Sequence, residues 1–250
     1  MIRSDDVETA RKMIFSHVTN EYPEIDFHFQ DLLRDDVVAE ECKKRGTPQT
    51  LFIGMDAVLL EFFQANTKVI QRIFQQSNVE AEFLSAQILM GEEPGLEIDQ
   101  KDFQQKLHSL ISSVNFREGS KKFLEHLKLQ KIDFFLLTDL QESTLEKFLG
   151  AENYAAKFLS GCKERIISRK SAAFKKKMGS VDFKRTILID YNIKTLKEMK
   201  EKGGVVLSCF SSPELSHKET LSDISLGFFH SLSEIVPQIL NIPAYPPFSK

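Results

Sequence analysis

The stretch Leu51-Phe-Ile-Gly-Met-Asp-Ala-Val-Leu-Leu60 decides the fold of this chain. It is apolar except for Gly54 and Asp56. Short apolar runs of this kind, with turn residues next to them, are typical of a strand buried in a parallel sheet. We therefore expect a buried strand that runs into a turn, with Gly54 and Asp56 at its carboxyl end.

Downstream of this stretch, helical and strand-like segments alternate. Alternation of this kind predicts an α/β fold with a parallel sheet and helices on both faces. Ligands bind such sheets at the carboxyl ends of the strands, where Thr138 and Asp190 also fall. The segments that we expect are helix 118–129, strand 132–138, helix 142–150, a short strand near 166–167, helix 171–178, strand 186–190, helix 193–202, strand 204–208, strand 226–229 and helix 231–240.

Three segments, taken in order, resemble the motifs of the haloacid dehalogenase (HAD) superfamily of phosphohydrolases. The first motif is an apolar strand followed by Asp-x-Asp-Gly-Thr/Val-Leu, which Leu51–Leu60 resembles. Ile132-Asp-Phe-Phe-Leu-Leu-Thr-Asp139 is similar to the second motif, and Arg185–Gly204 is similar to the fourth. The resemblance covers about residues 48–240. It implies a HAD-like Rossmannoid sheet with a helical cap inserted between the first and second motifs.

The resemblance places the family's nucleophilic aspartate on Gly54 and its proton-shuttling aspartate on Asp56. Glycine has no side chain, so residue 54 can neither attack phosphorus nor ligate a metal. Asp56 is then a residual general acid or simply a turn residue that accepts backbone hydrogen bonds. The resemblance therefore implies a degenerate member that lacks the nucleophilic Asp.

The remaining family positions fall on four residues. Thr138 matches the hydroxyl and Lys170 the third-motif lysine, so both are candidate phosphate-binding residues. Asp190 is the surviving acid of the fourth motif, and Lys194 takes the place of its second acid. Lys194 is either a cation that pairs with Asp190 in place of magnesium or a solvated helix residue. We predict no metal site, unless the protein is active, in which case Asp56 and Asp190 are the candidate ligands.

The chain divides into four parts by pattern. Residues 1–46 form a helical extension, which either covers the core or docks a partner. Residues 47–60 and 113–241 form the HAD-like core, 61–112 a helical cap insertion, and 242–250 a Pro-rich tail. In HAD enzymes such a cap closes over the active site, whereas here it is equally well a helical subdomain with its own core.

Composition excludes several classes of protein. The formal net charge of -3 gives no global field that attracts nucleic acid or a membrane. Cys42, Cys162 and Cys209 lie far apart, which argues against a zinc site or a disulfide framework. No apolar run is long enough for a transmembrane helix, and the acidic start is unlike a secretory signal. We therefore expect a soluble intracellular protein, with the compartment left open.

Three functional hypotheses follow. The first is a catalytically inactive pseudophosphatase without a cofactor, which binds a protein partner as a structural module or as a subunit of a complex. The alternative is a divergent Mg-dependent phosphohydrolase of a small phosphate ester, with Asp56 as nucleophile and a metal held by Asp56, Asp190 and Asp139. The second alternative is an RNA- or phosphate-binding module using the basic stretch 163–177, and nucleic acid is the less favoured partner.

Overall fold

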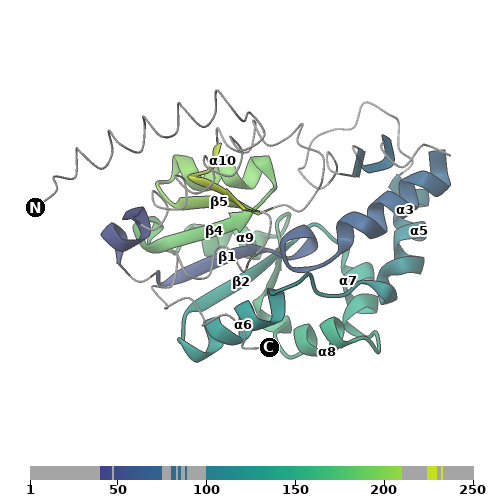
Figure 1. The fold of residues 1–250 in the computed structure, drawn as a ribbon, viewed down its shortest axis with the longest axis horizontal. Coiled ribbons are helices and arrows are strands. Elements are labelled where there is room, and N and C mark those ends of the chain that lie inside the picture. The colour runs from purple at the N-terminus through teal and green to yellow at the C-terminus, as the bar shows by residue number, and fades with distance from the viewer. Residues whose placement is uncertain are drawn as a thin grey trace, which may run out of the picture.

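A six-stranded parallel sheet forms the centre of the protein in a computed structural model (Figure 1). The structure describes residues 40–46, 48–74, 80–82, 84–85, 88, 100–209, 224–229 and 232. The strand order is β3-β2-β1-β4-β5-β6. The strands are β1 (Thr50–Gly54), β2 (Asp133–Thr138), β3 (Ile166–Ser168), β4 (Thr186–Asp190), β5 (Val205–Cys209) and β6 (Gly227–Phe229).

The first apolar stretch forms the centre of this sheet. Ile53 of β1 pairs with Leu136 of β2 on one side and with Ile189 of β4 on the other. Every residue of β4 and β5 is buried, as expected for strands that are covered by helices on both faces. The expected parallel sheet is therefore confirmed, and β1 has neighbours on both of its edges.

The helices between the strands cover both faces of the sheet. The connections β1→β2 and β2→β3 run across the sheet in one direction, whereas β3→β4 and β4→β5 run in the other. Because such crossovers are right-handed, the two groups of helices lie on opposite faces. One face carries α6 (Ser120–Leu129), α7 (Glu142–Leu149) and α8 (Tyr154–Ser160), and the other carries α9 (Ala172–Met178) and α10 (Ile193–Glu201).

The chain leaves the core after β1 through a π-helix, η2 (Met55–Leu59), in which the amide of Leu60 donates to the carbonyl of Met55. Leu60 then forms an isolated antiparallel bridge with Phe116, where the chain returns. Between these points lie α3 (Phe62–Phe74), α5 (Gln100–Leu110) and the 3-10 turn η3 (Ile111–Ser113). Helices α3 and α5 pack together and project beyond the sheet (Figure 1).

The expected elements agree with the observed ones to within about two residues at each end, the usual uncertainty of such boundaries. The structure differs in two places: the expected turn after β1 is the buried π-helix η2, and helix α8 was not expected. Of the expected helical extension 1–46, residues 40–45 are described and helical. Residues 1–39 of that extension, the expected helix 231–240 except Leu232, and the tail 242–250 lie outside the described residues. Two 3-10 turns, η4 (Lys163–Arg165) and η5 (Phe183–Arg185), precede β3 and β4.

Within the described ranges, no helix combines the length and the apolar character that crossing a lipid bilayer requires.

Candidate functional site

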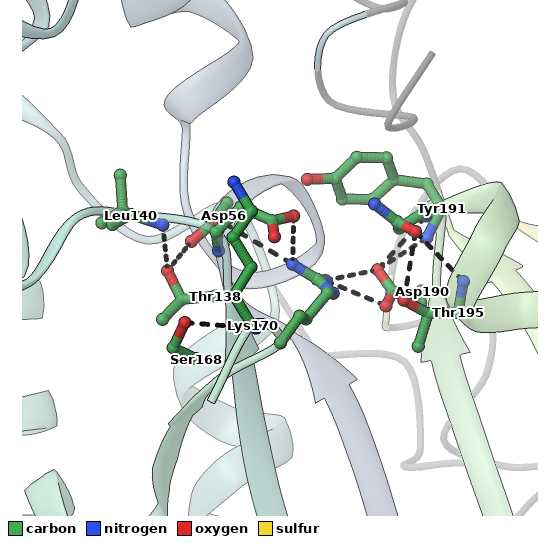
Figure 2. Close-up of polar contacts among 11 residues, drawn as sticks. Asp56, Thr138, Leu140, Ser168, Lys170, Asp190, Tyr191 and Thr195 are labelled. Carbon is green, nitrogen blue, oxygen red and sulfur yellow. Dashed lines mark hydrogen bonds and ion pairs between the residues drawn. The ribbon is translucent and has the colours of Figure 1, made fainter. Parts of the chain in front are cut away.

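The carboxyl ends of β1, β2 and β4 meet at one edge of the sheet and bring three predicted residues together. Asp56 lies in η2, Thr138 ends β2 and Asp190 ends β4. Their exposed fractions are 3%, 0% and 0%. The strand connections change direction between β1 and β4, which is where open α/β sheets bind their ligands. Asp56 and Thr138 approach the centre of the site from one side, and Asp190 approaches from the other (Figure 2).

Arg169 occupies the centre of this site. Its Nη2 donates to both carboxylate oxygens of Asp190 at 2.9 Å, and its Nη1 donates to Oδ2 of Asp139 at 2.8 Å. The same Nη1 lies 3.7 Å from Oδ2 of Asp56. The side chain is only 5% exposed. One buried guanidinium therefore contacts three carboxylates from η2, β4 and the residue that follows β2.

The end of β3 explains why Arg169 reaches the site. Ser168 pairs with Thr138 in the sheet, and the amide of Arg169 continues this ladder by donating to the carbonyl of Thr138 at 3.0 Å. The chain then turns away, because Ser171 caps α9 through its hydroxyl, which accepts from the amide of Phe174. Arg169 is thus fixed at the carboxyl end of an edge strand.

Asp56 is held by two hydrogen bonds besides its ion pair with Arg169. The hydroxyl of Thr138 donates to Oδ1 at 2.6 Å, and the amide of Asp139 donates to Oδ2 at 2.7 Å. Burial raises the pKa of Asp56 to about 6, and the positive charge of Arg169 only partly offsets this effect. Asp56 therefore titrates near neutral pH, unlike an ordinary aspartate.

Asp190 and Arg169 form a tightly coupled pair. Burial raises the pKa of Asp190, while Arg169 and the amide of Tyr191, which donates at 2.9 Å, favour the ionised carboxylate. Burial alone would lower the pKa of Arg169, but the surrounding carboxylates, Asp190 first, raise it on balance. The guanidinium stays protonated in any case, because its charge is not lost in proteins at ordinary pH.

Gly54 lies directly against this pair. A Cβ atom built on Gly54 would lie 2.3 Å from Oδ1 of Asp190 and 3.2 Å from Nη2 of Arg169. Real Cβ atoms do not approach other atoms so closely as the first distance. The space in front of residue 54, where the resemblance expects a side chain, is therefore filled by the Arg169–Asp190 pair.

The two predicted lysines lie outside this cluster. Lys194 is exposed, and the cation that pairs with Asp190 is Arg169. Of the two interpretations of Lys194, the structure therefore supports the solvated helix residue and contradicts the pairing with Asp190. The reason is the position of Arg169 at the end of β3, where it reaches Asp190 from across the sheet. Lys170 is also exposed, and its amide donates to the hydroxyl of Ser168 (Figure 2).

Sequence reasoning missed Arg169 as a site residue. It stands next to Lys170 in the basic stretch 163–177 and carries no motif of its own. The expected short strand near 166–167 was the one available signal, because it places the following residues at the carboxyl edge of the sheet. Asp139 was named as a metal ligand of the phosphohydrolase alternative, and the structure shows its ion pair with Arg169.

The site does not fit a magnesium ion. Magnesium requires near-octahedral oxygen ligands, and the carboxylate oxygens that face the centre of this site already contact a guanidinium. In the part of the chain that the structure describes, no group of three or more His, Cys, Asp or Glu side chains is arranged to hold a metal.

Several cations of the basic stretch 163–177 are paired with other side chains of the same protein. Arg165 Nη1 lies 2.8 Å from Oδ1 of Asp133, and Lys177 Nζ lies 3.8 Å from Oδ2 of the same residue. Both cations also stack on aromatic rings of β2, Arg165 on Phe134 and Lys177 on Phe135. Together with Arg169, three cations of the stretch are engaged by internal partners, which weakens its interpretation as a nucleic-acid surface.

Comparisons with known proteins agree on the fold. No protein-family model matches the sequence, and no curated protein matches it either. Solved structures of HAD-type proteins do match at low sequence identity. A putative phosphoglycolate phosphatase from Lactobacillus plantarum is 13% identical, with a TM-score of 0.58 over 77% of this chain and 100% of that one.

Two further solved structures give the same result. A HAD family hydrolase from Deinococcus radiodurans R1, solved with bound phosphate and sodium, is 14% identical, with a TM-score of 0.56 over 77% of this chain and 96% of that one. The putative HAD hydrolase YfnB from Bacillus subtilis, bound to magnesium, is 16% identical, with a TM-score of 0.53 over 79% and 100%. This chain therefore has a HAD-like fold.

Proposed function

We propose that this protein is a catalytically inactive HAD-like pseudophosphatase that serves as a binding or structural module. One observation carries the proposal: the guanidinium of Arg169, paired with Asp190, fills the space in front of Gly54. The HAD-like fold and the aligned strand ends support the assignment of residue 54 to the nucleophile position. The proposal follows because the site lacks two elements that phosphoryl transfer requires, namely a nucleophile and a place for the phosphoryl group with its metal.

The first missing element is the nucleophile. Covalent phosphoryl transfer in this fold requires a carboxylate at the position of Gly54, and a glycine offers none. The neighbouring groups leave no room for a replacement, because Oδ1 of Asp190 would lie 2.3 Å from a Cβ there. Asp190 cannot easily move away, since Arg169 holds both of its oxygens and the amide of Tyr191 donates to one.

The second missing element is a place for the phosphoryl group and its metal. The hydroxyl of Thr138 and the amide of Asp139, which lie where a phosphoryl oxygen would need donors, both donate to Asp56. Arg169 already supplies a fixed positive charge to the carboxylates. A divalent cation would have to displace this charge or share its ligands at short range, which is unfavourable in a poorly solvated site.

The divergent-phosphohydrolase alternative rests on Asp56. Its carboxylate lies beside a cation, and its pKa of about 6 suits a group that exchanges protons near neutral pH. To attack phosphorus, however, Asp56 would have to give up two short hydrogen bonds. The same two carboxylate oxygens would also have to leave a buried position that is only 3% exposed.

A turnover assay separates the two functions. With p-nitrophenyl phosphate and magnesium, we expect the wild-type protein to show no hydrolysis above buffer, and Gly54→Asp to show none either. The control for turnover is Asp56→Asn: wild-type turnover that disappears in this variant would establish the phosphohydrolase instead.

Gly54→Ala should cost about 1–3 kcal/mol of unfolding free energy, because its Cβ overlaps a fixed carboxylate.

The binding role requires a partner, and we propose a protein. The natural docking element outside the HAD-like core is the tail 242–250, which contains Tyr245 and Phe248. Aromatic residues of this kind anchor protein interfaces. Affinity purification of the full chain should recover a stoichiometric protein, and a bare monomer with nothing bound would contradict the module.

A further inference from the structure

Charge is distributed very unevenly along this chain. Residues 163–202 contain 13 Lys and Arg against 5 Asp and Glu, whereas residues 1–39 contain 4 Lys and Arg against 9 Asp and Glu. The formal net charge of the whole chain is only -3. A nearly neutral protein therefore contains one strongly basic and one acidic segment.

The fold gathers the exposed part of the basic segment on one face. Helices α9 and α10 lie on the same side of the sheet, because the connections β3→β4 and β4→β5 cross it in the same direction. Phe174 of α9 packs edge-on against Phe52 of β1, which fixes α9 on that side. We call the exposed lysines of this layer the basic face: Lys175, Lys176, Lys184, Lys194, Lys197 and Lys200.

The basic face has few acidic neighbours among the described residues. Lys175, Lys176, Lys194 and Lys197 form no ion pair within the described part of the chain, and Glu198 is paired with Lys202 at 2.7 Å. The opposite face differs. There Lys121 lies 3.4 Å from Glu125, and Lys157 lies 2.8 Å from Glu152. Positive charge is therefore concentrated on one side of the sheet.

The chain enters the described structure beside this face. Residues 40–45 are helical, and Cys42 is buried in the core. Arg45 Nη1 donates to the carbonyl of Gly203 at 2.8 Å, two residues after the end of α10. The first described segment, residues 40–45, therefore lies beside the C-terminal end of α10. Even a fully helical segment of the length of residues 1–39 would span about 58 Å, several times the length of α10.

We propose that the acidic N-terminal segment, residues 1–39 of the same chain, covers the basic face formed by α9 and α10. Opposite charge and a fixed starting point beside α10 select this occupant over an external one. The methylene stems of the lysines add apolar surface to the basic face. The extension then acts as an internal cover that keeps the basic face from external polyanions.

Zero-length carbodiimide cross-linking of the full-length protein tests this contact directly. Peptide mapping should find amide links between Asp or Glu side chains of residues 1–39 and the lysines of α9 and α10. The links should disappear in 1 M NaCl, where the screening length is about 3 Å. The charge reversals Lys176→Glu and Lys197→Glu, combined in one chain, should lower their yield several-fold. The matched control combines Lys122→Glu and Lys147→Glu, exposed lysines of the opposite face, and should leave the yield unchanged.

Three results would overturn the proposal, the third of them from mixed isotopically labelled chains. One is a map in which the N-terminal acids link to lysines of α6 and α7, or to none. Another is retention of the wild-type full chain on a heparin column at 0.15 M NaCl, which would mean that the basic face is open to a polyanion. Mixing isotopically heavy and light chains identifies a second copy as the occupant, since links between heavy and light peptides would contradict an internal cover. None of these readouts involves phosphatase turnover, so the cover and the pseudophosphatase proposal fail separately.

Discussion

At the scale of single residues, Arg169 and Asp56 determine the character of the site. Arg169 gathers three carboxylates around one guanidinium at the ends of β1, β2 and β4. In a buried position such a pair is weak evidence for stability, because desolvation offsets much of the attraction. Removing Arg169 would be costly, however, since the carboxylates of Asp56 and Asp190 would then stay buried without their cation. Asp56 keeps an elevated pKa because burial outweighs the charge of Arg169.

Asp56 should make the folded protein less stable as the pH rises. Its pKa is about 6 in the folded state against 3.8 for an ordinary aspartate, so the folded protein binds this proton more tightly. The associated stability is fully present below pH 3.8 and is lost as the pH rises through 6. In urea unfolding at pH 7.5, Asp56→Asn should gain about 1–3 kcal/mol over wild type, because it keeps a neutral side chain in place.

The geometry favours this substitution. An asparagine oxygen can accept from the amide of Asp139, while its amide donates to the hydroxyl of Thr138. The advantage of Asp56→Asn should vanish near pH 4, where the wild-type carboxyl is protonated. The exposed Glu146→Gln serves as the control and should show no pH-dependent difference. A loss of stability in Asp56→Asn at pH 7.5 would contradict the pKa assignment.

At the scale of elements, Asn153 links α8 to the end of the inserted segment. Its Oδ1 caps α8 by accepting from the amide of Ala156 at 2.8 Å. Its Nδ2 donates to the carbonyls of Ser112 and Val114 at 2.8 and 3.1 Å. These two carbonyls lie in and just after η3, so one side chain joins a core helix to the point where the insertion rejoins the core.

Two substitutions separate these roles. Asn153→Ser keeps a capping oxygen but loses both donations, and we expect it to cost about 1 kcal/mol. Asn153→Ala also loses the cap and should cost about 1 kcal/mol more. Chemical denaturation of the three proteins at one pH measures both steps. Equal stability of Asn153→Ser and wild type would mean that the link to η3 contributes nothing.

At the scale of the whole molecule, the HAD-like sheet carries the Arg169–Asp190 pair at its strand ends. Residues of β1, β4 and β5 form one continuous core, and a guanidinium takes the place where positive charge is needed between β1 and β4. The protein therefore combines a HAD-like fold with a site whose centre is occupied by its own side chain.

Magnesium should leave the melting temperature of this protein unchanged. A ligand stabilises the folded state only if it binds there, and the carboxylates of Asp56, Asp139 and Asp190 already contact Arg169. Thermal unfolding in millimolar MgCl2 should match a sodium chloride control at equal ionic strength, which corrects for screening of surface charge. A dose-dependent rise above that control would show a bound divalent cation.

The architecture of this protein could be predicted from its sequence. Short apolar runs such as Leu51–Ile53 and Ile187–Ile189 are typical of buried strands, and the alternation of strands with helical segments predicted the parallel sheet. The same runs placed Gly54, Asp56, Thr138 and Asp190 at one edge, because the carboxyl ends of parallel strands meet there. Each of these inferences depends on the order of apolar and polar residues within one segment, which can be read from a single sequence.

Which cation lies in the site could be seen only in the folded structure. Lys170, Lys194 and Arg169 are all basic residues near a strand end, and the sequence gives no reason to prefer one of them. The choice depends on the register of β3 beside β2, which aims Arg169 inward and leaves Lys170 exposed. Such register is a long-range property, since residues 168 and 138 meet only when the sheet has formed. The burial that raises the pKa of Asp56 has the same origin, because it arises from the packing of elements distant in sequence.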